Sequence, residues 1–126
     1  MKKVAIITIH NGTQKDLNKL ILSVNNQVTK PNLHLIISKK KININSHCNF
    51  RKYIIGKDKS IYNAMNIGLR KTKNYFLLFL NSGDYLFSTN SIKGLKQNIK
   101  SKNTCLNFVT LLKYEKYFYK IKKKNF

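Results

Sequence analysis

Acidic residues are scarce in this sequence of 126 residues, which has four of them against 25 lysines and arginines and a formal net charge of +21. It also has no tryptophan, one proline and two cysteines, Cys48 and Cys105, without CxxC or Cys/His spacing. The cysteines therefore predict neither a disulfide framework nor a zinc site. No apolar run approaches the roughly 18 residues of a membrane-spanning helix, and the chain opens on a β-type run instead of a signal sequence. We expect a cytoplasmic protein, soluble or at the inner face of the membrane.

The excess of positive charge predicts attraction to polyanions such as nucleic acid, nucleotide phosphates or anionic lipid. Only Arg51 and Arg70 are arginines, and lysine lacks the planar fork that reads a base with two hydrogen bonds. No helix-turn-helix, RNP-type or zinc-finger motif accompanies the charge. We therefore expect no specific nucleic-acid partner. A noncatalytic basic protein that binds nucleic acid or anionic membrane through charge alone remains the alternative function.

The length and the apolar fraction of 42% suit a single cored domain. Short apolar runs alternate with segments of helical periodicity, which predicts an α/β domain with a mainly parallel sheet. Strands are predicted at 4–9, 33–37, 53–55, 75–80 and 105–112. Helices are predicted at 13–28, from residue 60 to about 69, and around 92–99. The run at 75–80 is the most hydrophobic and predicts a central strand buried on both faces. We expect the domain to cover 1–112 and a basic, aromatic tail without assigned structure to cover 113–126.

Polar residues follow each confident strand of the predicted sheet, at 10–12, 38–40, 56–58 and 81–84. Ligands of parallel α/β sheets bind outside the carboxyl ends of the strands. Asp58 and Asp84, two of the four acids, come directly after strands, where a carboxylate is able to hold a divalent cation or a sugar hydroxyl. Ordinary alternatives stay open, because Asp84 also suits a turn and Asp58 also suits a helix N-terminus. Together with the nearby lysines, these acids predict a phosphate-bearing ligand.

Two segments of the sequence resemble the core of the family 2 glycosyltransferases. Residues 58–68 read D-K-S-I-Y-N-A-M-N-I-G, where many members of that family read D-K-G-I-Y-D-A-M-N-x-G. Residues 75–84 read Y-F-L-L-F-L-N-S-G-D, which is similar to the family's hydrophobic strand ending in F-L-N-S-D-D or F-L-N-S-G-D. The run at 4–12 is also similar to the family's first strand. The resemblance spans about residues 4–87.

The resemblance implies a GT-A fold, which is a Rossmann-like α/β domain with a mainly parallel sheet flanked by helices, here incomplete at the C-terminus. It implies a hexosyltransferase-type enzyme that transfers a sugar from a nucleotide-diphosphate sugar to a saccharide or lipid-linked acceptor in surface polysaccharide biosynthesis, with possible peripheral contact to the membrane. It also implies that Asp84 binds Mg²⁺ or Mn²⁺ as part of a DxD-like motif. The donor-binding residues that it implies are Thr8, His10, Asn11, Asp58, Asn66 and Asn81.

The sequence departs from the family pattern in three respects. Residues 38–41 read S-K-K-K, where relatives carry an acid that reads the base. Asn63 replaces the family's acid in I-Y-D-A-M, and Gly83 leaves Asp84 as the only carboxylate of the DxD-like motif. Family catalytic domains are longer, so we expect the acceptor-binding half and its catalytic base to be missing after Leu112. No catalytic residue is identified, and a truncated or inactive product or one part of a split enzyme are the open readings.

Overall fold

A computed structural model of the chain describes residues 2–44, 48–56, 60–100, 110–114 and 117–121. The helices are α1 (Gln14–Asn25), α2 (Ile61–Lys71) and α3 (Ser91–Asn98). The strands are β1 (Val4–His10), β2 (Leu33–Ser38), β3 (Arg51–Ile55), β4 (Phe76–Phe79), β5 (Thr110–Tyr114) and β6 (Tyr117–Ile121). The predicted order of the first seven elements, β-α-β-β-α-β-α, is confirmed.

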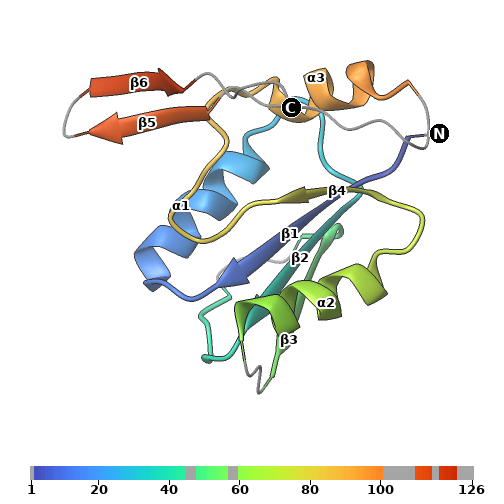
Figure 1. Cartoon of the computed structure of the whole chain (residues 1–126), viewed down its shortest axis with the longest axis vertical. Helices are drawn as coiled ribbons and strands as arrows, with labels where there is room; N and C mark the ends of the chain where they lie inside the picture. Colours follow the sequence, from blue (N-terminus) through green and yellow to red (C-terminus); the bar gives the residue numbers. More distant parts are fainter. Residues whose placement is uncertain (1, 45–47, 57–59, 101–109, 115–116, 122–126) are drawn as a thin grey trace.

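Four strands form a parallel sheet in the order β3-β2-β1-β4, which confirms an α/β fold and is compatible with a Rossmann-like arrangement. Helix α2 covers one face of this sheet, whereas α1 and α3 cover the other (Figure 1). Parallel strands require such crossover connections, and their helices bury both faces of the sheet. The domain therefore has three layers with β1 in the middle one.

Strand β1 forms the centre of the core, and all seven of its residues are buried. Its alternate side chains go to opposite faces: Ile7 and Ile9 pack with Ala64 of α2, whereas Ile6 packs with Leu20 of α1. A continuous β-branched run suits a strand that is covered on both faces, because neither face then requires polar side chains. The run at the start of the sequence therefore predicts this strand correctly.

Each of the first two helices begins after a residue whose side chain caps it. Thr13 accepts a hydrogen bond from the backbone N–H of Asp16 at 3.1 Å, and Ser60 accepts one from the N–H of Asn63 at 3.2 Å. Each bond satisfies one of the backbone donors left free at a helix N-terminus. Helix α2 also lies very close to the sheet at Gly68, where a Cβ atom would be 2.9 Å from Ile7 Cγ2. The glycine therefore fixes the depth at which α2 sits.

Helix α1 is shorter than the predicted helix at 13–28, because it ends at Asn25. The chain leaves the helix shortly before Gln27, whose side chain is hydrogen-bonded to residues outside α1. The Gln27 amide donates to the carbonyl of Ser88 at 2.7 Å and accepts from the N–H of Ile92 at 3.0 Å. Both partners lie more than 60 positions away in the sequence, so the hydrophobic periodicity of 13–28 does not predict these bonds.

Strand β4 corrects the expectation of a central strand, because it is the last strand of the described sheet and pairs only with β1. Its first three residues are half-buried and Phe79 is 36% exposed. A run of apolar residues indicates that both faces are covered, but it does not tell how many neighbouring strands there are. The prediction of a central strand took an apolar sequence as a sign of two neighbouring strands.

The C-terminal part also differs from the expectation. Residues 110–114 and 117–121 form the antiparallel pair β5 and β6, so part of the segment expected as an unstructured tail is a two-stranded sheet. The other residues of the strand expected at 105–112, which are 105–109, lie outside the described residues. The described helices include none that is long and apolar enough to cross a membrane.

Candidate functional site

The carboxyl ends of β1 and β4 meet at the point where the strand order reverses. The chain runs from β1 through β2 to β3 in one direction and then returns to the other side of β1 as β4. Beyond the strand ends, the backbone N–H of Asn11 donates to Ser82 Oγ at 3.2 Å, and the N–H of Ser82 donates to the carbonyl of Ile9 at 3.4 Å. Crevices at such reversal points are the usual ligand sites of open α/β sheets. The fold therefore brings the segments 10–12 and 81–84 together, as the sequence predicts.

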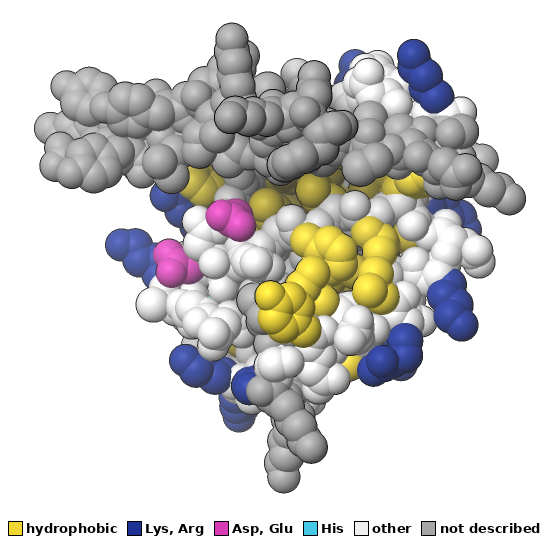
Figure 2. Space-filling model, in the orientation of Figure 1, with side chains coloured by type: hydrophobic (Ala, Val, Ile, Leu, Met, Phe, Trp, Pro, Cys, Tyr) yellow, Lys and Arg dark blue, Asp and Glu magenta, His cyan; other side chains and the backbone are white. Residues whose placement is uncertain are grey.

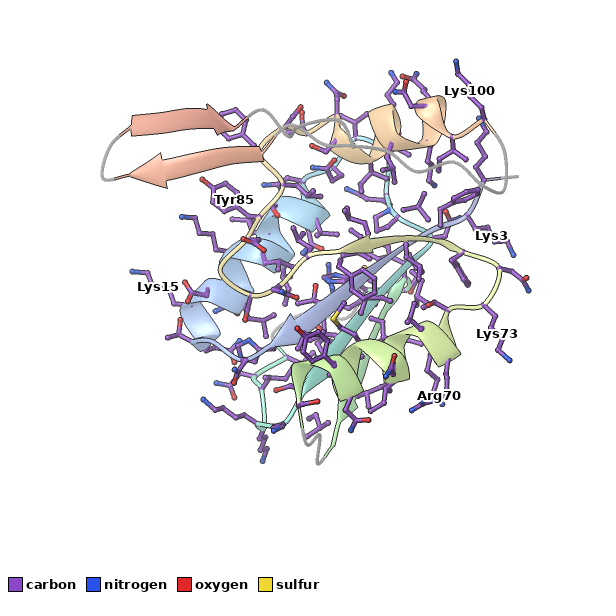
Figure 3. The ribbon with its side chains drawn as sticks, viewed as in Figure 1. Lys3, Lys15, Arg70, Lys73, Tyr85 and Lys100 are labelled. Carbon is purple, nitrogen blue, oxygen red and sulfur yellow. The ribbon has the colours of Figure 1, made fainter. Side chains whose placement is uncertain are left out.

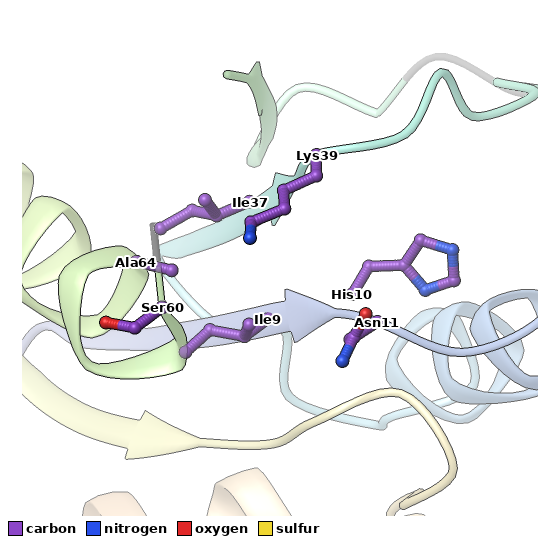
Figure 4. A pocket seen from close by; sticks show the side chains of 7 residues that line it. All are labelled: Ile9, His10, Asn11, Ile37, Lys39, Ser60 and Ala64. Carbon is purple, nitrogen blue, oxygen red and sulfur yellow. The ribbon is translucent and has the colours of Figure 1, made fainter. Parts of the chain in front are cut away.

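A small pocket lies beside this point, between the ends of β1 and β2 and the first turn of α2 (Figure 4). Its volume is about 60 Å³, which suits a phosphate-sized group and not a whole nucleotide sugar. Its apolar wall and its polar rim consist of Ile9, Ile37 and Ala64, and of His10, Asn11, Lys39 and Ser60. Two residues of the implied donor set, His10 and Asn11, therefore line a pocket with Lys39.

Lys39 supplies positive charge to this pocket. The Lys39 amino group points toward Ser60 and Ala64, at the N-terminus of α2 (Figure 4). No carboxylate is among the lining residues that the structure describes. The N-terminal end of a helix carries a partial positive charge, and an ammonium group adds a full one. The pocket therefore favours an anionic group such as a phosphate.

His10 is a buried titratable group at the edge of the pocket. The residue is 5% exposed, and its Nδ1 has no hydrogen-bond partner within the described part of the chain. Burial lowers the pKa of His10, the positive charge of Lys40 lowers it further, and the carboxylate of Asp16 opposes both. The imidazole is therefore neutral at pH 7, and its ring is turned away from the side chains of Ile37, Ser60 and Ala64 (Figure 4).

Two other residues of the implied donor set do not reach the pocket. Thr8 is fully buried, and its hydroxyl oxygen lies 2.8 Å from Nε2 of His34 inside the domain. Asn66 is exposed on α2, two positions after Ala64. Two positions turn an α-helix by about 200°, so Asn66 faces away from the pocket wall that Ala64 forms. Asp58 lies outside the described residues.

Asn81 and Asp84 form a tight turn after β4. The carbonyl of Asn81 accepts a hydrogen bond from the N–H of Asp84 at 3.0 Å, and Gly83 between them has a φ of +99°. Glycine adopts this left-handed conformation without strain. Both polar side chains of the turn belong to exposed residues. The ordinary turn role of Asp84 is therefore real, and it leaves the carboxylate accessible to a ligand.

Asp16 borders the candidate site, and it is not among the site residues that the sequence predicts. A Cβ atom on Gly12 would lie 3.2 Å from Ser82 Oγ and 3.5 Å from Asp16 Oδ2. A carboxylate from α1 and a hydroxyl from the turn after β4 therefore flank the same glycine. The signal for this was present, because an acid in the first turn after β1 must lie near the carboxyl edge of the sheet.

The oxygen atoms near Gly12 supply only some of the ligands that a hard cation such as Mg²⁺ requires. Among the described residues, no group of three His, Cys, Asp or Glu side chains is close enough to hold a metal ion. Mg²⁺, however, commonly binds through one or two carboxylates and takes its other oxygens from water and substrate phosphates. Asp84, with Asp16 as a second carboxylate on the same edge, fits this mode. The chemistry of the donors therefore permits a cation that binds together with a phosphorylated ligand.

Comparison of the chain with models of protein families, with curated proteins and with solved structures finds no match. The geometry of the site and the motif resemblance are therefore the grounds for a functional proposal.

Proposed function

We propose that this domain binds a nucleotide-diphosphate sugar and forms the donor-binding part of a family 2-like glycosyltransferase with a GT-A fold. The observation that carries the proposal is the pocket at the carboxyl ends of β1 and β2, into which Lys39 and the N-terminus of α2 direct positive charge. A diphosphate is the part of such a donor that requires this charge. The parallel order β3-β2-β1-β4 supports the proposal, because nucleotides bind at the reversal point of such sheets.

Each residue of the site has a distinct task in this proposal. Lys39 and the first turn of α2 hold a phosphate group. The side chains of Asn11 and Asn81, which are exposed at the two strand ends, donate or accept hydrogen bonds with the ribose or the sugar. Asp84 would hold Mg²⁺ or Mn²⁺ against the diphosphate.

Sugar transfer breaks the bond between the anomeric carbon and the diphosphate, so negative charge develops on the departing nucleotide. A bound divalent cation would neutralise part of that charge. Lys39 and the N-terminus of α2 act in the same sense as fixed positive groups that need no rearrangement during the reaction. The acceptor would be a saccharide or lipid-linked hydroxyl of surface polysaccharide assembly, and we assign no base for it. Such an enzyme would work in the cytoplasm, at the inner face of the membrane when the acceptor is a lipid.

The proposal is tested by thermal unfolding of the whole chain with uridine and guanosine diphosphate sugars, with and without Mn²⁺. A ligand that binds only the native state raises the midpoint. We expect one of these donors to raise it in moderate salt, and we expect Lys39→Gln to reduce that rise. Lys93→Gln is the matched control, because Lys93 is an exposed lysine of α3 that does not line the pocket.

Two outcomes contradict the proposal. A clean unfolding transition that no nucleotide sugar shifts would remove the donor-binding role. Binding of RNA or anionic vesicles that falls steeply with salt, and that Lys39→Gln and Lys93→Gln weaken equally, would favour the noncatalytic basic protein instead.

A further inference from the structure

Strand β4 has one edge without a neighbour among the strands that the structure describes. The backbone N–H of Phe76 donates to the carbonyl of Lys3 at 2.8 Å, and that of Leu80 donates to the carbonyl of Ile7 at 3.0 Å. Alternate residues of a strand direct their N–H and C=O groups to opposite sides. Leu77 and Phe79 therefore direct theirs away from β1, to the open edge. This row of backbone groups is able to pair with a further strand.

Apolar side chains flank that open edge. Phe79 is 36% exposed, and on the adjacent helix α2 Tyr62 and Leu69 are 74% and 43% exposed. Figure 2 shows apolar side chains gathered at the surface over the region where β4 and α2 lie in Figure 1. Large apolar side chains at the surface are common one by one, but a group of them indicates a contact surface.

The opposite edge of the sheet is protected in a way that β4 is not. Strand β3 carries the exposed Lys52, and the backbone N–H of Arg51 is already bonded to the carbonyl of Cys48 at 3.1 Å. Charged residues on an edge strand are a common device against unwanted pairing. The four residues of β4, Phe-Leu-Leu-Phe, contain neither a charge nor a proline. Of the two edges, β4 is therefore the one suited to pairing.

Charge decides which strand fits this edge. Lys3, Lys73 and Arg70 are spread along the side of the molecule on which β4 begins and α2 ends (Figure 3). A second copy of the chain also has a net charge of +21, so two copies repel each other. An extended segment with acidic residues gains from the same charges.

We propose that the open edge of β4 accepts an extended strand from another polypeptide, one that carries acidic side chains. Backbone hydrogen bonds to Leu77 and Phe79 hold the added strand, and its alternate side chains pack on the apolar surface that Tyr62 and Phe79 form. The lysines and arginine on the side where β4 begins pair with its acids. This mode of recognition takes affinity from the backbone and specificity from the side chains. It is independent of nucleotide-sugar binding, which uses the carboxyl end of the sheet.

The probe for this proposal is a fluorescent peptide of about eight residues, with alternating valine and threonine and glutamate at both ends. Its matched control has the same sequence with alternate backbone amides methylated, which keeps the charge and removes the donors that pair with β4. We expect the unmodified peptide to bind the whole chain and the methylated peptide to bind at least about tenfold more weakly. Fluorescence anisotropy at moderate salt measures both affinities.

Variants of the protein separate the backbone from the side chain. Phe79→Pro removes an N–H that β1 does not use, whereas Phe79→Thr keeps it. We expect Phe79→Pro to weaken peptide binding at least about tenfold and more than Phe79→Thr does. Val28→Thr is the control, because Val28 is 67% exposed and lies outside β4 and α2. Tyr62→Glu, which leaves the strand unchanged, is the second variant if Phe79→Pro lowers the unfolding midpoint, and we expect it to weaken binding too.

Other results overturn the proposal. Equal affinity for the methylated peptide, or no binding of the probe, would mean that the edge does not pair. A dimer in sedimentation that Phe79→Pro dissociates would identify a second copy as the occupant. Binding to vesicles with about 30% phosphatidylserine that Tyr62→Glu abolishes, without peptide binding, would identify a bilayer instead.

Discussion

Thr8 and His10 lie two positions apart on β1 and belong to the same face of the sheet, yet their surroundings differ. The Thr8 hydroxyl is 2.8 Å from His34 Nε2, inside a buried hydrogen-bonded network that also includes Arg51, whose Nη1 has no partner among the described residues. His10 is also buried, but its Nδ1 has no partner among the described residues and it borders the pocket. Buried polar atoms are normally paired. The same strand therefore has a polar residue that is paired inside the fold and, at its end, one whose Nδ1 the described residues leave unpaired.

The network around Thr8 fixes the protonation state of His34. Arg51 Nε donates to His34 Nδ1 at 2.9 Å, and Arg51 Nη2 donates to Asn25 Oδ1 at 2.8 Å. Because arginine is only a donor, His34 Nδ1 must accept, so the proton is on Nε2 and is donated to Thr8. A second proton on His34 would be on Nδ1, where it would point at the N–H of Arg51 Nε and replace this hydrogen bond by a repulsive contact. Burial first, and then the charge of Arg51, lower the pKa of His34 to about 3.

The contrast between the surroundings of Thr8 and of His10 is tested by removing His34, which we expect to lower the free energy of unfolding most. His34→Ala leaves Arg51 Nε and the Thr8 hydroxyl without their partner and opens a cavity in a fully buried place. We expect the free energy of unfolding to fall by about 3 kcal/mol. His10→Ala should lower it by about 1 kcal/mol, because no hydrogen bond of His10 Nδ1 is lost. Urea unfolding measures both values, and equal losses would refute the distinction between the two histidine environments.

The pH dependence of stability gives the next largest effect. The pKa of His34 is lowered in the folded chain and ordinary in the unfolded chain, so below pH 6.5 the unfolded chain binds more protons. Stability is then greatest above pH 6.5 and falls as the pH decreases toward 3, by up to about 1.4 kcal/mol per pH unit for this group. His10, whose pKa is also lowered, acts in the same direction. Urea unfolding between pH 7 and 4 should show a smaller slope for His34→Gln than for wild type; an unchanged slope would mean that His34 is not neutral.

The sequence predicts the β-α-β order well because each signal is local. The β-branched run at 4–9 becomes a buried strand, and Thr13 and Ser60 cap the helices that follow them. It fails where distant residues decide. Nothing near Thr8 shows that His34 will lie beside it, so its family-based assignment to the donor site missed the buried network. The edge position of β4 depends on which strand pairs with which, and that is not a property of any single run.

The part of the site that the sequence predicts consists of the polar residues that follow the strands. Because the carboxyl ends of parallel strands share one edge, the polar residues after β1 and β4 were expected to meet, and Asn11 does contact Ser82. Lys39 was noticed only as a departure from a family pattern. Its place at the pocket depends on the length of β2 and on the first turn of α2, and only the three-dimensional structure combines them.

A smaller change tests the junction between the two strand ends. Ser82→Ala removes the acceptor of the Asn11 N–H at the surface of the site. We expect the free energy of unfolding to fall by about 0.5–1 kcal/mol, because this bond is exposed and water replaces it. Affinity for a stabilising nucleotide sugar should fall as well, since the loop at 10–12 loses its tie to the turn after β4. Isothermal titration measures that affinity; unchanged affinity together with unchanged stability would separate this contact from the site.

We expect the smallest effect on stability at Asp84, the proposed cation ligand, because Asp84 is exposed whereas His34 is buried. Asp84 is exposed and lies in a turn that its backbone N–H closes by donating to the carbonyl of Asn81, so Asp84→Asn should change the free energy of unfolding by less than about 0.5 kcal/mol. It removes the carboxylate that would hold Mn²⁺, so we expect the metal-dependent part of nucleotide-sugar stabilisation to disappear. Asp16→Asn, on the neighbouring helix end, is the matched carboxylate change. If Asp16→Asn removes the metal dependence and Asp84→Asn does not, the cation binds on the α1 side of Gly12. If neither variant alters the metal dependence, neither carboxylate holds the cation, and the cation binds through the diphosphate itself.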